Sequence, residues 1–176
     1  AVGVLAANRE IYAMGMGCPV EEVQDRWAQA IANPIPPKEI SSEEAPCHEV
    51  IIEGDDLDKP GNALDAIPVP ISTPGWDVGP VATLTQYVTR DPDTGLTNMG
   101  NYRAQIKAPR RMGMNPSLEL RPGIYVHWEK MKKRGEKLPA AVVLGAPSCV
   151  TFTAAQKLPE NLEEITVAGG LVGSPI

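Results

Sequence analysis

Proline and glycine limit the folding of this chain more than any other feature of its sequence. The 176 residues include 18 prolines and 16 glycines, whereas phenylalanine occurs once. Proline lacks a backbone donor and clashes with the preceding helical turn, and glycine weakens the interior of helices and strands. The sequence therefore predicts many short elements joined by turns. Its length suits one domain with a substantial core, or one domain with part of a second.

The first third of the chain predicts two helices and an irregular connector. Residues 8–17, NREIYAMGMG, form a short amphipathic candidate with Asn8 as its N-cap. Residues 19–33 predict a second helix, with Pro19 at the first helical position and apolar residues along one face. Residues 34–47, PIPPKEISSEEAPC, cannot continue that helix because of their prolines. We expect an extended connector there.

Strand patterns dominate from Cys47 onward. Residues 48–54, HEVIIEG, predict a short strand, and the proline-broken run 65–72 predicts an edge strand at best. Two β-rich runs, VATLTQYVT at 81–89 and LTNMGNYRAQIK at 96–107, are joined by the turn residues RDPDTG. This pattern predicts a β-hairpin.

The last part of the chain mixes both patterns. Residues 124–135, IYVHWEKMKKRG, predict a strand up to about Trp128 and then a basic helix or loop. The apolar run LPAAVVLGAP at 138–147 predicts a buried strand. Residues 148–159 predict a helix capped by the first serine, and residues 160–173 predict another helix that ends at glycines.

Charge and cysteine content exclude several classes of protein. The net charge of −6 argues against a general nucleic-acid binder, since phosphate neutralisation needs clustered cations. The basic runs at 107–113 and 127–137 suit a small phosphorylated ligand, although a solvated basic face explains each run equally well. The three cysteines are widely spaced, which fits neither a disulfide framework nor a zinc site.

The sequence gives no signal for a membrane or for export. No apolar run approaches the roughly 18–20 residues that a spanning helix needs. The N-terminal stretch AVGVLAANRE lacks a charged region followed by a long apolar one. We expect a soluble, cytoplasmic protein that binds neither membrane nor nucleic acid.

One predicted strand carries polar residues where a core strand would carry valine or isoleucine. In TGLTNMGNYRAQI, alternation places Asn98 and Arg103 on opposite faces, so a shared site requires a bulge, which Gly100 would permit. An arginine can bind a carboxylate through two parallel hydrogen bonds, and an asparagine oxygen suits a hard divalent cation. The alternative is an edge hairpin with a solvated Asn98 and Arg103.

A histidine followed by a basic run is the second candidate site. A lone histidine is more often structural than a ligand, but His127 precedes four cations that together could hold a phosphate. They are Lys130, Lys132, Lys133 and Arg134. The sequence has no dinucleotide-binding GxGxxG after a strand, no P-loop and no GxSxG.

Four segments in order resemble one family, the UbiD-type decarboxylases, which use prenylated FMN. They are APCHEVIIEGDDLD, DPDTGLTNMGNYRAQI, VHWEKMKK and LPAAVVLGAPSCVTFTAAQKLPENLEEITVAGGLVGSP, and they span about residues 44–176. The resemblance implies an α+β fold with a split β-barrel related to FMN-binding flavin reductases. It assigns residues 47–176 to that barrel and residues 1–46 to a helical and extended connector from the end of an N-terminal α/β domain.

The same resemblance implies roles for the polar strand. Asn98 corresponds to a metal-ligating asparagine that holds manganese, with potassium as a further candidate ion, at the cofactor phosphate. Asn101, Tyr102 and Arg103 line the flavin. Arg103 is also the arginine of the family's catalytic Glu-Arg-Glu set.

The basic segment receives roles by resemblance as well. His127 and Trp128 match the next cofactor-contacting motif, and His127 is a candidate second metal ligand. Lys132 stands where members place a phosphate-contacting cation. The run Met131 to Lys133 departs from the His-Lys pair that is common there.

The implied activity is the reversible, non-oxidative decarboxylation of an aromatic, heteroaromatic or α,β-unsaturated acid. The modified flavin supplies the electron sink, Arg103 orients the acid, and a carboxylic acid delivers a proton to carbon. Expected partners are the small acid, a flavin prenyltransferase that supplies the cofactor, and further copies of the chain in a homo-oligomer. The alternatives are a non-catalytic flavin-binding or scaffolding subunit and, less favoured, a plain FMN reductase.

The chain departs from the family in one respect. The two catalytic glutamates, and the metal-binding glutamate, normally lie downstream of a position equivalent to Ile176. The sequence therefore predicts a middle piece of a longer member, which carries the cofactor-binding part without the complete acid/base apparatus.

Overall fold

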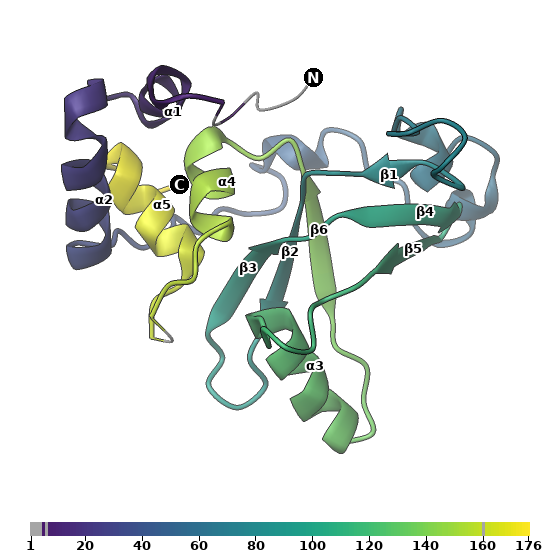
Figure 1. Cartoon of the computed structure of the whole chain (residues 1–176). Helices are drawn as coiled ribbons and strands as arrows, with labels where there is room; N and C mark the ends of the chain where they lie inside the picture. The colour runs from purple at the N-terminus through teal and green to yellow at the C-terminus, as the bar shows by residue number, and fades with distance from the viewer. Residues whose placement is uncertain (1–4, 6, 160) are drawn as a thin grey trace.

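The computed structural model describes residues 5, 7–159 and 161–176 as an α+β fold. Within these residues there are five α-helices and two three-stranded antiparallel sheets, with strand orders β1-β4-β5 and β3-β2-β6 (Figure 1). The helices are α1 (Arg9–Met16), α2 (Val23–Ala32), α3 (Gly123–Lys133), α4 (Ser148–Ala154) and α5 (Glu164–Val172). The strands are β1 (Val81–Ala82), β2 (Thr85–Arg90), β3 (Thr97–Asn101), β4 (Ala104–Ala108), β5 (Arg111–Met114) and β6 (Ala140–Leu144).

The two N-terminal helices agree with the sequence prediction. Asn8 caps α1, because its side-chain oxygen accepts a hydrogen bond from the backbone N–H of Ile11 at 2.9 Å, and Gly17 ends it with φ 65°. The second predicted helix begins as a 3-10 turn at Val20–Glu22 and continues as α2. The connector that follows α2 is irregular, as its prolines predict.

The predicted strand at residues 48–54 is wrong. Residues 46–66 contain three short 3-10 turns, and the side chains of Val50 and Ile51 are 75% and 60% exposed. An extended segment is counted as a strand only when a neighbouring strand satisfies its backbone groups, and no strand within the described residues pairs with this one. The apolar run alone was an insufficient signal.

The hairpin of β2 and β3 is confirmed, but the predicted bulge at Gly100 is wrong. The two strands pair in continuous register from Gln86 opposite Asn101 to Arg90 opposite Thr97. The chain leaves this sheet only at residues 102–103, before β4 enters the other sheet. Gly100 instead permits a close approach, since a Cβ there would lie 2.5 Å from a ring carbon of Tyr102.

The strand predicted up to Trp128 is also wrong, because α3 begins at Gly123, directly after Pro122. Proline fixes a backbone angle that suits a helix start, and the buried side chains of α3 recur at helical spacing. They are Ile124, His127 and Met131. Helix α3 packs against β2 and β3.

The strand β6 forms where the apolar run predicts it, but it is an edge strand rather than a buried one. It pairs only with β2 among the described strands. Val142 and Leu144 are 40% and 42% exposed. A continuous apolar run therefore located the strand correctly and overestimated its burial.

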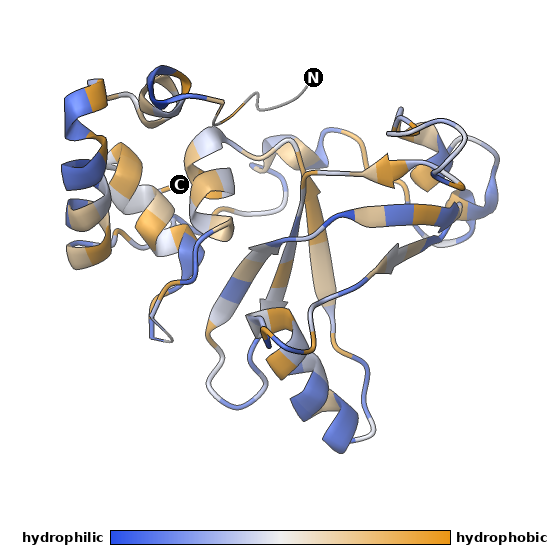
Figure 2. Ribbon diagram, viewed as in Figure 1, coloured by the Kyte–Doolittle hydropathy of each residue, from blue (hydrophilic) through white to orange (hydrophobic). Residues whose placement is uncertain are grey.

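The largest core lies in the helical layer. Residues of α1, α2, α4 and α5 pack together with Met99 of β3 (Figures 1 and 2). The glycines of α5 permit this packing, since a Cβ at Gly170 would lie 2.9 Å from Cα of Ala30. A smaller cluster of Tyr87, Ala104 and Ile124 lies between the sheets and α3. In the part of the chain that the structure describes, no helix is long and apolar enough to span a membrane.

Candidate functional site

Two consecutive glutamates at the start of α5 cap the open edge of β3. In an antiparallel pair, every second backbone N–H of an edge strand faces away from its neighbour. The N–H of Thr97 donates to Oε1 of Glu163 at 2.6 Å, and the N–H of Met99 donates to Oε2 of Glu164 at 2.8 Å. Side-chain carboxylates therefore replace the missing strand on this edge.

Asn98 lies between these two anchor points. Its Nδ2 donates to Oε1 of Glu164 at 3.0 Å. A Cβ at Gly123, the first residue of α3, would lie 2.4 Å from Cγ of Asn98, so the helix start leaves room for this amide. The Oδ1 of Asn98 is buried and has no hydrogen-bond partner in the described structure. A buried oxygen with an unused lone pair thus lies next to a carboxylate.

Burial dominates the electrostatics of this edge. It raises the pKa of Glu164, and the hydrogen bonds from Met99 and Asn98 oppose the shift only in part, while the charge of Glu163 adds to it. Burial also raises the pKa of Tyr102 to about 12, with a contribution from the charge of Glu164. Burial therefore disfavours the charged form of the Glu164 carboxylate.

Asn101 does not share a site with Asn98. Its Oδ1 accepts from Nε2 of Gln86 at 2.9 Å, and its Nδ2 donates to the carbonyl of Thr151 in α4 at 3.0 Å. The Oε1 of Gln86 and the Oγ1 of Thr151 are also buried without partners. No carboxylate contacts these two atoms within the described residues, so this α4-facing cluster lacks the chemistry of a cation site.

Arg103 is exposed at the crossing between the two sheets. The preceding residue, Tyr102, is anchored, because its N–H donates to the carbonyl of Thr85 at 3.0 Å. Among the described residues, no hydrogen bond or ion pair involves the Arg103 side chain. Its guanidinium is therefore free to bind a ligand, and no neighbouring carboxylate orients it in this chain.

His127 lies beside Asn98 but makes its own contacts. Its Nδ1 is 2.9 Å from Oγ1 of Thr89, which is the direct cross-strand neighbour of Asn98. Its Nε2 is 3.7 Å from Oδ2 of Asp91. Burial lowers the pKa of His127, and the Asp91 carboxylate opposes this only partly. No described contact joins His127 to Asn98 or Glu164.

The other basic residues of α3 divide between two roles. Lys130 binds Asp91 at 2.7 Å and Asp93 at 3.0 Å, and Arg134 pairs with Asp93, so these cations hold the hairpin loop. Lys132 lies on the exposed face, with its Nζ 4.7 Å from the ring centre of Trp128. The structure therefore does not bring Lys132 and Trp128 together with the buried His127.

Sequence reasoning did not single out Glu164, the buried carboxylate that binds the Asn98 amide. The available signal was the acidic pair that opens the last helix. No group of three or more His, Cys, Asp or Glu side chains comes together among the residues that the structure describes. At this edge the Oδ1 of Asn98 is the described oxygen left without a partner, since both Glu164 oxygens accept hydrogen bonds, and an amide oxygen suits a hard divalent cation.

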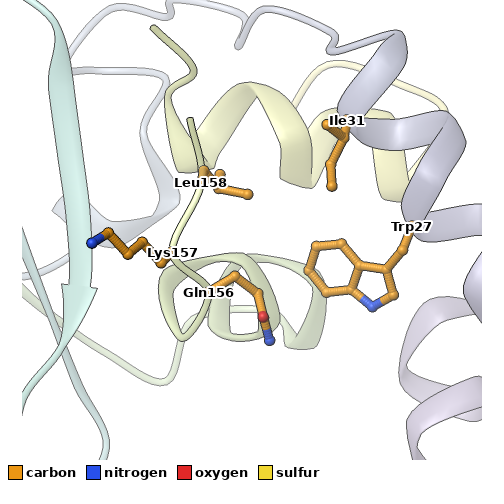
Figure 3. Close-up of a pocket in the computed structure, with 5 residues that line it drawn as sticks. All are labelled: Trp27, Ile31, Gln156, Lys157 and Leu158. Atoms are coloured by element: carbon orange, nitrogen blue, oxygen red, sulfur yellow. The ribbon is translucent and has the colours of Figure 1, made fainter. Parts of the chain in front are cut away.

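A separate pocket lies in the helical layer. It has a volume of about 260 Å³, and it is lined by Trp27 and Ile31 of α2 and by residues 156–158, which follow α4 (Figure 3). The Lys157 ammonium points away from its centre (Figure 3). The pocket contains none of the residues singled out from the sequence.

The chain is thus an α+β protein with two antiparallel sheets, and comparison with known proteins identifies its family. Residues 38–176 match the family described as the UbiD 3-octaprenyl-4-hydroxybenzoate carboxy-lyase Rift-related domain. The chain belongs to the UbiD family, whose structurally similar members are decarboxylases.

Several relatives support this assignment. The uncharacterized protein sll0936 of Synechocystis sp. (strain ATCC 27184 / PCC 6803 / Kazusa) is 32% identical, over 96% of this chain and 36% of its own length. An evolved dimeric form of the UbiD-class enzyme HmfF from Pelotomaculum thermopropionicum, in complex with prFMN, matches with 29% identity and a TM-score of 0.85, over 98% of this chain and 38% of its own. Klebsiella pneumoniae 3,4-dihydroxybenzoic acid decarboxylase (AroY) matches with 27% identity and a TM-score of 0.81, over 99% and 35%. The chain thus spans little more than a third of the length of these relatives.

Proposed function

We propose that this chain is the cofactor-binding part of a reversible, non-oxidative decarboxylase of an aromatic, heteroaromatic or α,β-unsaturated acid, dependent on prenylated FMN and manganese. The observation that carries the proposal is the buried, unpaired Oδ1 of Asn98 beside the Glu164 carboxylate. The similarity to HmfF, which binds prFMN, supports it. The two sheets would be the parts of a split β-barrel.

Asn98 and His127 would hold the manganese ion, with potassium as a further candidate, and the cofactor phosphate would complete its ligands. Glu164 would orient the Asn98 amide through its hydrogen bond to Nδ2. Thr89, the neighbour of His127, pairs with Asn98 across the strands, and the lowered pKa of the imidazole ring favours the neutral form that binds metals. In this proposal the Thr89 hydrogen bond orients the ring.

The flavin would lie along the segment that crosses from β3 to β4. Tyr102 and Arg103 would contact it through their side chains, whereas Asn101 would contribute its backbone, since its amide is already bound to Gln86 and Thr151. Trp128 and Lys132 on the outer face of α3 would contact the cofactor or its phosphate from an exposed position.

Arg103 would bind the substrate carboxylate. A free, exposed guanidinium can form two parallel hydrogen bonds with a carboxylate and so orient the bond that breaks. Prenylated FMN, when bound, supplies the electron sink for the pair left by carbon dioxide. A carboxylic acid must then protonate the carbon.

The proposal also covers the partners, the assembly and the location of the protein. Family members act on small carboxylic acids, so a flavin prenyltransferase would supply the cofactor and the chain would assemble as a homo-oligomer. One similar structure is a dimeric form of HmfF. We place the protein in the cytoplasm, where a prenylated flavin would be made.

Substitution of Arg103 tests the catalytic assignment. In the protein supplied with prenylated FMN and manganese, Arg103→Ala should abolish decarboxylation of a panel of aromatic acids. The flavin should still be bound to the protein, as its absorbance would show. Arg111→Ala removes another exposed arginine, in β5, and is the matched control. Full activity in Arg103→Ala contradicts the role given to this residue.

A second function has one observation in its favour. No carboxylate contacts Arg103 within the described residues, so the chain by itself would bind flavin without catalysis, as a scaffolding or flavin-binding subunit. Stoichiometric flavin binding without turnover of any acid, under conditions that preserve the cofactor, would favour this alternative. Bound unmodified FMN with oxidation of NADH would instead indicate a reductase.

A further inference from the structure

The sheet of β3, β2 and β6 has two outer edges, and their backbone groups are satisfied to different degrees. At β3, the carboxylates of Glu163 and Glu164 accept from the outward N–H groups, and α4 and α5 pack against the strand (Figure 1). At β6, no strand in the described part of the chain pairs with the outer edge, and no backbone hydrogen bond from outside the sheet reaches it. One edge of the sheet is therefore closed and the other is open.

The register of the sheet identifies the backbone groups that face the open edge. Because the N–H of Met99 points away from β2, its cross-strand partner Val88 points its own N–H and C=O toward β6. Val88 lies opposite Ala141 of β6. Since directions alternate along a strand, the backbones of Ala141 and Val143 bond to β2, and those of the remaining residues of β6 face outward. These residues are Ala140, Val142 and Leu144.

The open edge lacks the features by which proteins usually protect an edge strand. Edge strands commonly carry lysine, proline or a bulge, which discourage pairing with another chain. The sequence of β6 is AAVVL, and its register with β2 is continuous, so it has none of the three. The side chains of Val142 and Leu144 are exposed. An apolar edge with free backbone groups is a template for a further strand.

The geometry of the edge makes it complementary to itself. The outward residues are centred on Val142, so a two-fold axis at this residue would place Ala140 opposite the partner's Leu144. Val142 would lie opposite the partner's Val142. Every outward N–H and C=O of both strands would then be paired, and apolar side chains would meet apolar side chains. Lys137, the last charged residue before β6, would face the partner's Pro147, so like charges are kept apart.

We propose that β6 is the interface between two copies of this chain, which pair antiparallel through their open edges. The two three-stranded sheets would become one continuous sheet. Its outer edges would both be β3, which Glu163 and Glu164 close, so the assembly stops at two copies. The inference gives a surface to the homo-oligomer proposed above, and it depends on neither the metal nor the flavin.

A proline at the centre of β6 tests this interface. In Val142→Pro the lost N–H faces outward, so the ladder with β2 keeps its hydrogen bonds, and proline is tolerated at such edge positions. The dimer loses its central pair of hydrogen bonds, and its dissociation constant should rise about tenfold or more. Val142→Lys, which places a charge opposite its own copy, should act in the same direction. Val78→Lys changes another exposed valine, outside the strands, and is the matched control.

Sedimentation equilibrium and amide hydrogen exchange of the chain, without metal or flavin, provide the measurements. We expect the wild type and Val78→Lys to shift from the mass of one chain to that of two as concentration rises, and both Val142 variants to shift at higher concentration. The amides of Val142 and Leu144 should become protected only in the dimer, whereas those of Ala141 and Val143 are protected in both states.

Three results would overturn the inference. They are a wild type that stays monomeric at every concentration, a dimer that the Val142 substitutions do not weaken, and a dimer in which the Val142 amide exchanges as fast as in the monomer. Protection of the Val142 amide in the monomer would indicate a strand from the same chain at this edge, which also excludes the second copy. Since no step of the experiment uses Mn²⁺, flavin or an acid substrate, any of these results leaves the proposed function to its own test.

Discussion

The hairpin of β2 and β3 is held at two junctions that differ in how completely their polar groups are satisfied. At the loop end, Asp91 and Asp93 bind Lys130, and Arg134 adds a second pair. At the strand edge, Glu163 and Glu164 bind the backbone of β3, yet Oδ1 of Asn98 is left buried without a partner. Buried polar groups are nearly always paired in proteins, so an exception invites a functional explanation.

The difference shows why residue type alone is a weak guide to function. The α3 run looks like the phosphate site in the sequence, but two of its cations are used to fix a loop. The acidic start of α5 looks like an ordinary helix start in the sequence. In the structure it binds the edge of β3, which is the one of these two junctions where an oxygen, Oδ1 of Asn98, has no partner. In both cases the partner of the side chain, and not its charge, decides which function remains available.

The largest expected effect comes from changing Glu164. Glu164→Gln should weaken Mn²⁺ binding about 10–100-fold, because Glu164 orients the Asn98 amide through its hydrogen bond to Nδ2. A glutamine offers one oxygen where Met99 and Asn98 both donate, so one buried donor loses its acceptor, at about 1–3 kcal/mol of folding free energy. Metal titration and urea unfolding measure the two effects.

Glu163→Gln is the matched control for this change, because it makes the same replacement one residue earlier. Among the described residues, the N–H of Thr97 is the one donor to the Glu163 side chain, so the single oxygen of a glutamine suffices. If both variants lose Mn²⁺ binding equally, the loss does not come from the hydrogen bond between Glu164 and Asn98.

A glycine substitution should give the next largest effect. In Gly123→Ala the new Cβ would lie 2.4 Å from Cγ of Asn98, so either the helix start or the amide must move. We expect a loss of about 1–3 kcal/mol in unfolding free energy, together with weaker Mn²⁺ binding. Gly79→Ala, whose Cβ would meet its nearest neighbour at 3.6 Å, is the control. Unchanged Mn²⁺ binding in Gly123→Ala would separate α3 from the metal site.

The sequence predicted the elements whose signals are local. The cap at Asn8 and the turn at Gly95 each depend on neighbours within a few residues, and the structure contains both. The failures depend on distant partners. The run at 48–54 lacked a neighbouring strand, and Gly100 was needed for the Tyr102 ring rather than for a bulge.

The residues of the site also divide into those with a local sequence signal and those that depend on distant partners. Asn98 was selected from the sequence because a polar side chain in a strand is unusual, and the structure gives it a buried environment with an unpaired oxygen. Glu164 lies 65 residues from Met99, its backbone partner, so no local pattern connects them. The predicted bulge at Gly100, which was to bring Asn98 and Arg103 to one site, is wrong, because β3 pairs with β2 in continuous register through Gly100.

A smaller effect on folding stability is expected from pH, through His127 of α3. Burial lowers the pKa of His127 in the folded chain below its ordinary value of 6.5. As pH falls, the unfolded chain therefore binds the proton first, so folding stability is greatest above about 6.5 and declines below it. Urea unfolding from neutral to mildly acidic pH should show this decline, and His127→Gln should reduce it. An identical pH profile in the variant would assign the decline to other groups.

The smallest effect should come from the exposed ion pair between Arg134 and Asp93 at the loop end of the hairpin. Arg134 pairs with Asp93, and both side chains are about half exposed, so solvent and salt screen the interaction. Arg134→Ala should leave Mn²⁺ binding unchanged and should lower thermal stability by less than Gly123→Ala does, with the difference shrinking at high salt. Since Lys130 still binds both aspartates, the hairpin loop stays in place. A loss of Mn²⁺ affinity in Arg134→Ala would mean that the loop end and the strand edge are coupled through the hairpin. The loop end, where the charged groups are paired, could then no longer be assigned a purely structural role.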